Sequence, residues 1–491
     1  MNRERILVER TLESLLNGKV AANVIAFLLN RKLFRDRVFA GLNSYFQKIS
    51  NRDYSISKKE YDRPAAVYSF RRSFARAFLN SLSGIYQESN KDCRETLSKA
   101  FVHGFILQGI HARREKREPM PGFVTISPTN ACNLKCTGCY AGEQLRKDTI
   151  EYDTFNWVTR QMNQEFKARF IVISGGEPFM YKSQGKNLFD YLEKNRQNYY
   201  LIYTNGTLIN KNAAEKLSRT GNASLAISVE GFEAETDGRR GPGVYKKVLE
   251  AMRNLREAGV SFGVSFTATS KNAALFIDGR LSNYFINKQG AKYIWVFQYM
   301  PIGRSPSVEL VPTPEQRLSM LQKTNELIER GIFTADFWNS GIASDGCMEA
   351  ARKGGYFYIL WTGEITPCVF DPFKDRDEKR NNVCALKENN LNLRDALNTP
   401  YFKASRNWQD SYWRLQPAER CGNLLMPCKI RDNSKTFYDI IKETQAVPIS
   451  ENAGGSDAYL KLIEEGKMPA YNCACRGILD PVWEKEFAGT K

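Results

Sequence analysis

The strongest constraint on the fold of this chain is a regular alternation of short apolar segments and longer amphipathic segments that starts near residue 122. The apolar segments have the length and residue types of β-strands, and each is followed by a segment with helical periodicity. The strand segments are 123–127, 169–174, 199–204, 224–229, 261–269 and 293–299. The helix segments are 152–166, 188–195, 210–218, 244–258, 273–286 and 314–330. Strands joined through helices form a parallel sheet, so we predict an α/β fold, closed or partly closed as a barrel.

The predicted barrel separates two regions of different character. Its last helix has a capping box at Thr313 and Gln316, and Gly331 is expected to end the helix. We therefore predict an all-helical N-terminal region at 1–120, a barrel domain at 121–331 and a small cysteine-rich α+β domain at 332–491.

The N-terminal region carries more than half of the net charge of +17. Amphipathic helical patterns with interleaved arginines cover residues 20–49 and 69–108. Such helices bind anionic membrane surfaces, nucleic acid or acidic partners, or they cover a core with a solvated basic face. The sequence leaves these alternatives open, although the chain has no recognisable RNA-binding module and nucleic acid is therefore not the expected partner.

The beginning of the chain lacks the apolar stretch and cleavage site of a signal peptide. The longest apolar run near it, residues 20–29, is too short to cross a bilayer. We therefore expect a cytoplasmic protein, with the basic helices as a candidate peripheral membrane contact. In that compartment the eleven cysteines are more often metal ligands than disulfide partners.

Three of these cysteines, Cys132, Cys136 and Cys139, follow the first predicted strand with CxxxCxxC spacing. Three thiolates on one short loop can hold three corners of an iron-sulfur cube and leave the fourth iron open. A structural zinc site requires a fourth ligand, and no other Cys or His follows closely. The spacing favours a cluster over zinc or over three unrelated thiols.

Later strands end in polar and glycine-rich segments. Gly175-Gly176-Glu177-Pro178 ends the second predicted strand, Tyr203-Thr204-Asn205-Gly206 ends the third, and Ser228-Val229-Glu230-Gly231 ends the fourth. Each segment alone reads as a turn. In such barrels the active site lies at the carboxyl ends of the strands. Three such segments at successive strand ends, beside the cysteine loop, therefore predict a shared binding site.

This combination closely resembles the radical S-adenosylmethionine (radical SAM) enzymes over residues 122–305. The resemblance implies a partial (β/α)6 barrel whose three loop cysteines hold a [4Fe-4S] cluster, with S-adenosylmethionine (SAM) chelated by the open iron. An electron from the cluster then cleaves SAM to methionine and a 5′-deoxyadenosyl radical, which abstracts hydrogen from a substrate. It also implies an electron donor such as flavodoxin or ferredoxin.

The resemblance also suggests residues that contact SAM. The segment Gly175-Gly176-Glu177 suits the ammonium group, while Ser228 and Arg240 match cofactor-contacting positions, with Arg239 as a near alternative for the arginine. The residue before the third cysteine is usually aromatic and packs near the adenine. Here it is Gly138, so Tyr140 is the candidate for that contact.

The C-terminal third resembles the auxiliary-cluster domain called SPASM, or its shorter twitch form. Cys347 is followed after fifteen residues by Gly363 and after four more by Cys368, within a predicted hairpin at 356–365. We expect at least one auxiliary iron-sulfur cluster, with Cys421 and Cys428 as further ligands. The full SPASM spacing is absent, and structural zinc is the main competitor.

The substrate is less constrained. No histidine follows His111, which excludes Ser-His-Asp hydrolysis and His-ligated zinc chemistry in the barrel, and no catalytic acid or base is identified. Relatives with auxiliary clusters often modify peptides, so we predict a radical SAM enzyme that acts on a peptide or protein. The alternatives are modification of a lipid or isoprenoid chain at a membrane surface, and a non-catalytic iron-sulfur or zinc binding protein.

Overall fold

The computed structural model covers most of the chain from residue 63 onward. The described residues are Arg37, Arg63, 65–101, Gln108, Glu115, 118–141, 148–304, 306–449 and 455–488. The helix predicted at 20–49 lies outside them, apart from Arg37.

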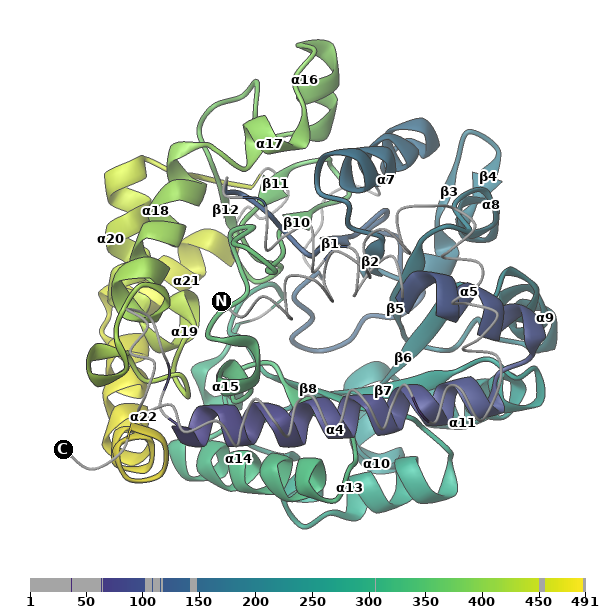
Figure 1. The fold of residues 1–491 in the computed structure, drawn as a ribbon, viewed down its shortest axis with the longest axis horizontal. Helices are drawn as coiled ribbons and strands as arrows, with labels where there is room; N and C mark the ends of the chain where they lie inside the picture. Colours follow the sequence, from purple (N-terminus) through teal and green to yellow (C-terminus); the bar gives the residue numbers. More distant parts are fainter. Residues whose placement is uncertain are drawn as a thin grey trace.

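Among the described residues, a nine-stranded sheet forms the centre of the molecule, in the order β11-β10-β1-β2-β5-β6-β7-β8-β9 (Figure 1). The strands are β1 (Phe123–Ile126), β2 (Phe170–Ile173), β5 (Tyr199–Thr204), β6 (Ala223–Val229), β7 (Phe262–Ala268), β8 (Ile294–Gln298), β9 (Thr334–Asp336), β10 (Tyr358–Ile359) and β11 (Ile365–Thr366). Neighbours from β10 through β1 to β9 pair in parallel, and β10 and β11 form an antiparallel hairpin. The predicted α/β fold and all six predicted strands are confirmed. Strands β9, β10 and β11 extend the sheet beyond residue 331.

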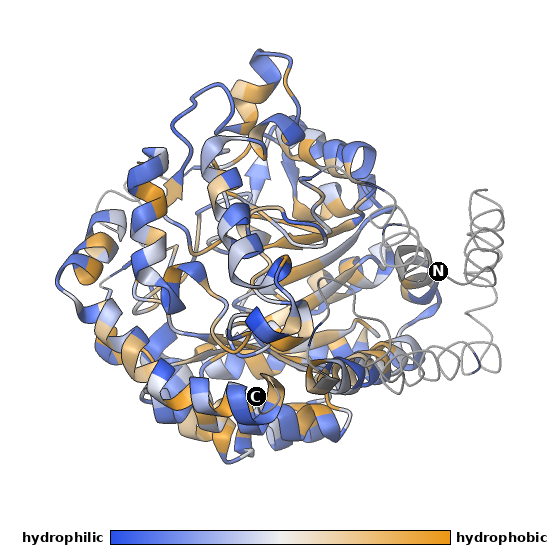
Figure 2. Cartoon of the chain, turned by 60° about the vertical axis from the view of Figure 1, so that its left-hand side comes forward, coloured by the Kyte–Doolittle hydropathy of each residue, from blue (hydrophilic) through white to orange (hydrophobic). Residues whose placement is uncertain are grey.

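Side chains alternate between the two faces of the sheet, as a strand period of two requires. In β2, Ile171 and Ile173 pack into the large core under the connecting helices, while Phe170 and Val172 pack into a second cluster on the opposite face. The connecting helices are α7 (Tyr152–Glu165), α8 (Leu188–Lys194), α9 (Lys211–Thr220), α10 (Glu233–Arg240), α11 (Val244–Glu257) and α14 (Pro314–Glu329). Apolar residues accordingly concentrate on the strands and on the inward sides of the helices (Figure 2).

The ends of α14 follow the sequence prediction, because the side chain of Thr313 accepts from the backbone of Gln316 and the capping box is complete. The predicted helix at 273–286 is instead divided into α12 (Ala273–Ile277), α13 (Arg280–Ser282) and a π-helical turn. The break falls at Gly279, whose φ of +82° lies in the left-handed region that helices exclude.

The described part of the N-terminal region is mainly helical, as predicted, and includes α4 (Ala65–Glu88) and α5 (Lys91–Phe101). Helix α4 runs alongside α14 in Figure 1 and buries Leu82 and Ile85 against the second face of the sheet. Several of its basic residues make internal contacts. Arg71 pairs with Asp345 at 2.6 Å, and Arg76 donates to the carbonyl of Glu329 at 2.9 Å. This part of the basic region therefore packs on the rest of the protein.

The C-terminal third adds mainly helices to one side of the sheet (Figure 1). They are α15 (Gly341–Ser344), α16 (Val383–Glu388), α17 (Leu393–Ala396), α18 (Pro400–Gln409), α19 (Lys429–Asp432), α20 (Ser434–Thr444), α21 (Gly455–Glu464) and α22 (Lys467–Trp483). Two small two-stranded antiparallel sheets accompany the main sheet, β3 (Lys182–Ser183) with β4 (Lys186–Asn187), and β12 (Phe373–Lys374) with β13 (Val447–Pro448). A fully buried ion pair, Arg317 Nη1 to Asp432 Oδ1 at 2.6 Å, connects α14 to α19.

No helix in the described part of the chain is both long enough and apolar enough to span a membrane. The proposed division at residues 120 and 331 stays a prediction.

Candidate functional site

The cysteine loop leaves the carboxyl end of β1 and packs directly on the end of β2. The amide of Gly176 donates to the carbonyl of Thr129 at 2.9 Å, and the amide of Glu177 donates to that of Ala131 at 2.8 Å. A Cβ on Gly176 would lie 2.4 Å from the carbonyl oxygen of Asn130. Only glycine fits there, so the Gly-Gly pair allows the backbone of the loop to approach the strand end closely.

Two arginines hold the other side of the loop. Arg239 donates through Nε to the carbonyl of Thr137 at 3.0 Å and through Nη2 to that of Gly138 at 3.3 Å. Arg304 donates through Nη1 to the carbonyl of Cys136 at 3.2 Å, and its amide donates to that of Cys139 at 3.0 Å. Sequence analysis missed Arg304, because it follows β8 and no motif marks it.

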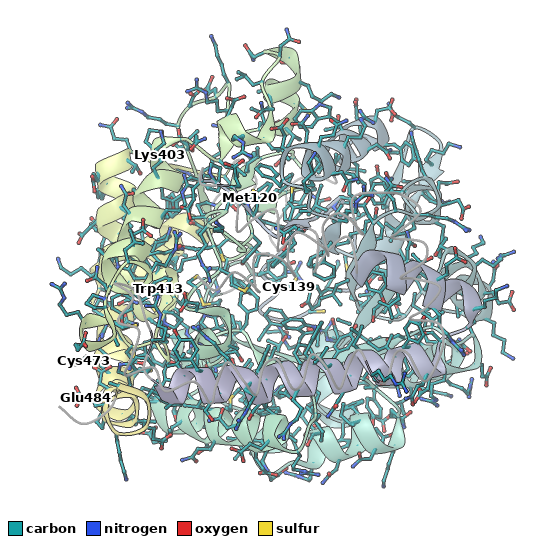
Figure 3. The ribbon with its side chains drawn as sticks, viewed as in Figure 1. Met120, Cys139, Lys403, Trp413, Cys473 and Glu484 are labelled. Atoms are coloured by element: carbon teal, nitrogen blue, oxygen red, sulfur yellow. The ribbon has the colours of Figure 1, made fainter. Side chains whose placement is uncertain are left out.

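We call Cys132, Cys136 and Cys139 the first cysteine group. Cys132 is exposed and the other two are half-buried, and all eleven cysteines of the chain are free thiols. Although the residue is exposed, partial desolvation of its thiol raises the pKa of Cys132 to about 11, and the charges of Glu177, Cys136 and Cys139 add to the rise. Figure 3 places Cys139 near the middle of the molecule.

The three thiols lie on one loop but are not gathered at one point. Within the described part of the chain, no three His, Cys, Asp or Glu side chains are already arranged to hold a metal ion. Protonated thiols are poor ligands, and metal binding stabilises the thiolate form. The assignment of the first cysteine group as cluster ligands therefore stays a prediction, supported by its donor chemistry.

A buried carboxylate lies beside this loop, at the end of β6. Glu230 is 1% exposed, and its Oε1 accepts from Arg239 Nη1 at 2.6 Å and from Arg240 Nη2 at 2.6 Å. Its Oε2 is buried and accepts no hydrogen bond from the described residues. Burial alone would lower the pKa of Arg240, but Glu230, Cys136 and Cys139 raise it above its usual value. A charged arginine and an unsatisfied carboxylate oxygen are thus held next to the cysteine loop.

Glu177 is buried and connects two strand ends. Its Oε1 accepts from Thr204 Oγ1 at 2.8 Å and from the amide of Phe179 at 3.2 Å, while its Oε2 accepts from the amide of Asn205 at 2.8 Å. Burial raises the pKa of Glu177, and these hydrogen bonds oppose the rise. In this arrangement Glu177 fixes the ends of β2 and β5, and its predicted contact with an ammonium group stays untested.

Ser228 and Tyr140, the other predicted SAM contacts, have different environments. Ser228 is half-buried in β6, opposite Ser265 of β7. The hydroxyl of Tyr140 lies 2.7 Å from Ser174 Oγ, and its ring meets that of Phe370 edge-on with centroids 5.9 Å apart. Tyr140 therefore bridges the end of β2 and the C-terminal region.

Gly138 is explained by its surroundings. Its φ is +64°, and a Cβ there would lie 2.8 Å from Cε2 of Tyr299. The ring of Tyr299, which directly follows β8, thus packs where a side chain at position 138 would begin. An aromatic ring is present next to the third cysteine, but a distant segment supplies it.

Among the predicted C-terminal ligands, Cys347, Cys368 and Cys428 are near enough for their charges to act on one another, and we call them the second cysteine group; as in the first group, the described side chains are not arranged to hold a metal ion. The pKa of Cys347 lies well above its usual value, first because of burial and then because of nearby Glu349, Cys428 and Cys368. Cys421 is different: burial raises its pKa to about 11, and the charges acting on it are those of Arg63, Asp345 and Arg71. No cysteine is among them.

Comparison with known proteins identifies the central segment. Residues 126–269 match the Radical SAM superfamily. Fe-coproporphyrin III synthase of Methanosarcina barkeri is 32% identical over 153 residues, which are 30% of this chain and 37% of that protein. The sporulation killing factor maturation protein SkfB of Bacillus subtilis is 27% identical over 184 residues, 36% of this chain and 43% of that protein. The chain thus spans less than half the length of either relative.

A solved structure, native anSMEcpe with bound AdoMet, aligns with 72% of this chain and 99% of its own, at 18% identity and a TM-score of 0.48.

Proposed function

Because residues 126–269 belong to the radical SAM superfamily, we propose that this chain is a radical SAM enzyme that reductively cleaves SAM and removes a hydrogen atom from a peptide or protein substrate. The observation that carries the proposal is the position of the cysteine loop. It is clamped between the Gly175-Gly176 segment and Arg239, and the buried Glu230–Arg240 pair lies beside it.

The residues present fit a [4Fe-4S] cluster and SAM. Three free thiols on one loop are a suitable ligand set for three irons. When bound, the cluster supplies one electron, which splits the sulfonium of SAM into methionine and a 5′-deoxyadenosyl radical that takes hydrogen from substrate. Radical SAM proteins as a family bind these two groups.

The chain's own residues bind and orient SAM in this proposal. Arg240 is charged and offers its guanidinium to the carboxylate of SAM, in exchange for part of its contact with Glu230. The unsatisfied Oε2 of Glu230 is an acceptor for a hydroxyl donor on the ligand. Gly175 and Gly176 lack side chains, which leaves their carbonyl groups approachable by the ammonium group.

The proposed peptide substrate is supported by relatives such as SkfB, whose name describes a maturation protein. We also propose a flavodoxin- or ferredoxin-type protein as the electron donor. A lipid substrate has weaker support, because Arg71 and Arg76 of the basic region make internal contacts. Full-length protein should therefore remain unbound in a flotation assay with anionic liposomes, and flotation would favour the lipid alternative and peripheral membrane contact.

The direct test of the chemistry is anaerobic reconstitution with iron and sulfide, followed by dithionite and SAM. We expect 5′-deoxyadenosine and methionine in equal amounts. Cys136→Ala should abolish both products. Cys473→Ser is the matched control, because Cys473 is exposed on α22, at the margin of the molecule in Figure 3. A reconstituted wild-type chain that leaves SAM intact would instead indicate a non-catalytic iron-sulfur protein.

A further inference from the structure

A cavity of about 110 Å³ lies between the N-terminal helices and the second face of the sheet. Its helical side is formed by apolar residues of α4 and α5, which are Phe78, Leu82, Ile85 and Leu97. Its sheet side is formed by residues at the amino ends of strands, such as Phe170, the first residue of β2, and Tyr199, the first residue of β5. The first cysteine group follows the carboxyl end of β1, so this cavity lies at the opposite end of the barrel.

The wall of the cavity is mainly apolar and aromatic, and two of its hydroxyl groups already have partners. Ser81 Oγ donates to the carbonyl of Lys292 at 2.7 Å, and Ser224 Oγ lies 2.7 Å from the hydroxyl of Tyr293. A wall of this kind offers water few hydrogen bonds, and its atoms lose packing contacts where the space is empty. A somewhat larger engineered cavity in another protein, of about 150 Å³, binds benzene. The space therefore suits one aromatic ring or a short acyl chain.

Arg169 is the one charged residue among the described residues that line this cavity. It directly precedes β2 and is half-buried. Its guanidinium makes no hydrogen bond or ion pair with the described residues, in contrast to Arg317, which pairs with Asp432. Burial lowers the pKa of Arg169, and no carboxylate opposes that effect. An unpaired guanidinium beside an apolar cavity is suited to an anion that carries an apolar group.

We propose that this cavity binds a small monocarboxylic acid, whose apolar body fills the space between α4, α5 and the sheet and whose carboxylate pairs with Arg169. A guanidinium can donate two parallel hydrogen bonds to one carboxylate. The aromatic and aliphatic wall removes the body of the ligand from water, as in other small-molecule sites. A one-ring aromatic acid and a short fatty acid share this chemistry.

A ligand in this position contacts both N-terminal helices and the sheet. A molecule that binds only the folded protein stabilises it, and the gain increases with the ligand concentration. The acid should therefore raise the Tm of the protein. Because the cavity and the cysteine loop are at opposite ends of the barrel, binding should leave the first cysteine group accessible. The proposal does not rest on the proposed SAM chemistry.

The test uses the full-length, anaerobically reconstituted protein with phenylacetate and hexanoate as probes. Isothermal titration calorimetry should show one bound molecule per chain, and each acid should raise the Tm. The neutral counterparts 2-phenylethanol and 1-hexanol should bind about tenfold more weakly, because they cannot form the charge-assisted hydrogen bonds. Tighter binding of phenylacetate would identify an aromatic acid, and tighter binding of hexanoate would identify a fatty acid.

Variants on two sides of the cavity separate its charge from its volume. Arg169→Gln should weaken binding of both acids about tenfold and leave binding of the alcohols unchanged. Arg160→Gln is the matched control, because Arg160 is exposed on α7. Leu97→Phe adds volume to the apolar wall and should weaken binding of acids and alcohols alike. Leu82→Phe serves the same purpose if Leu97→Phe does not fold. Formation of 5′-deoxyadenosine by Arg169→Gln should equal that of the wild-type chain.

Three results would overturn the proposal. The first is the absence of both heat and a change in Tm with either acid at millimolar concentration. The second is equal affinity for each acid and its alcohol, or unchanged acid binding by Arg169→Gln. In that case the guanidinium is solvated, and the aliphatic stem of Arg169 only covers the apolar wall. The third is full binding by folded Leu97→Phe and Leu82→Phe, which would place the ligand elsewhere.

Discussion

The first and second cysteine groups are built in opposite ways. The first lies on one loop, partly exposed, and is surrounded by cations: Arg239 and Arg240 both lower the pKa of Cys139 against the larger effect of burial. The second comes from three segments, and burial and the nearby charge of Glu349 both raise the pKa of Cys368. The difference fits the proposed roles of the two groups. A site that binds SAM must be accessible and positively charged, whereas a buried site must only neutralise its own charges.

The sharpest way to separate the two groups is to remove one sulfur from each. Cys136→Ala should abolish 5′-deoxyadenosine formation and leave the iron of the second group in place, because the two groups share no segment. Cys368→Ser should lose the second cluster and retain SAM cleavage in the absence of substrate. Iron content, sulfide content and product formation, measured on the same samples, decide the matter. Loss of both clusters in either variant would show that the groups are interdependent.

The difference in construction also explains what could be predicted from the sequence. The first group, the strands and the capping box at Thr313 depend on short-range patterns, and local physics determines such patterns. The fold class and the six predicted strands were accordingly confirmed. The joining of β10 to β1 depends on pairing between segments far apart in the chain, and no local pattern encodes it.

The same reasoning applies to individual site residues. Cys421 has ligand-like spacing to Cys428, and the charged groups that act on its thiol are Arg63, Asp345 and Arg71, so its assignment as a ligand stays a prediction. Arg304 is marked by no motif, and its contact with the cysteine loop follows only from the tertiary structure. Spacing indicates which sulfurs belong to one loop, but it cannot show which arginine from elsewhere in the chain contacts that loop.

A second prediction tests the cationic side of the first group. Glu230→Ala would leave Arg239 and Arg240, which are 18% and 11% exposed, without their shared carboxylate. Removing one partner from such a pair should lower the free energy of unfolding by about 3 kcal/mol, measured by urea denaturation. The KM for SAM should rise as well. Glu250→Ala is the control, because Glu250 forms an exposed pair with Arg253 at 3.9 Å. Equal stability of the two variants would contradict the assigned role of Glu230.

A third, smaller effect is expected at Arg304. Arg304→Gln removes the donation to the carbonyl of Cys136 while keeping the amide contact to Cys139. A hydrogen bond from a charged donor contributes about 1.5–3 kcal/mol. Because this contact is only partly buried, we expect a loss near the lower end of that range. The first cluster should be lost faster to a chelator such as EDTA, and the second should not change. Arg280→Gln, in an exposed pair with Asp278, is the matched control.

The smallest predicted effect concerns the second group and its one tyrosine contact. Tyr356→Phe removes the hydroxyl 3.1 Å from Cys368 Sγ but keeps the ring stacked on Phe123, with centroids 5.2 Å apart. Since hydrogen bonds to cluster sulfurs raise the reduction potential, the potential of the second cluster should fall while the unfolding free energy changes by about 1 kcal/mol or less.

Tyr358→Phe is a close control, because the hydroxyl of Tyr358 donates to Ser127 Oγ at 2.7 Å rather than to a sulfur. If both variants shift the potential equally, the tyrosine acts through general packing. A shift confined to Tyr356→Phe would place Cys368 on the cluster without relying on its removal.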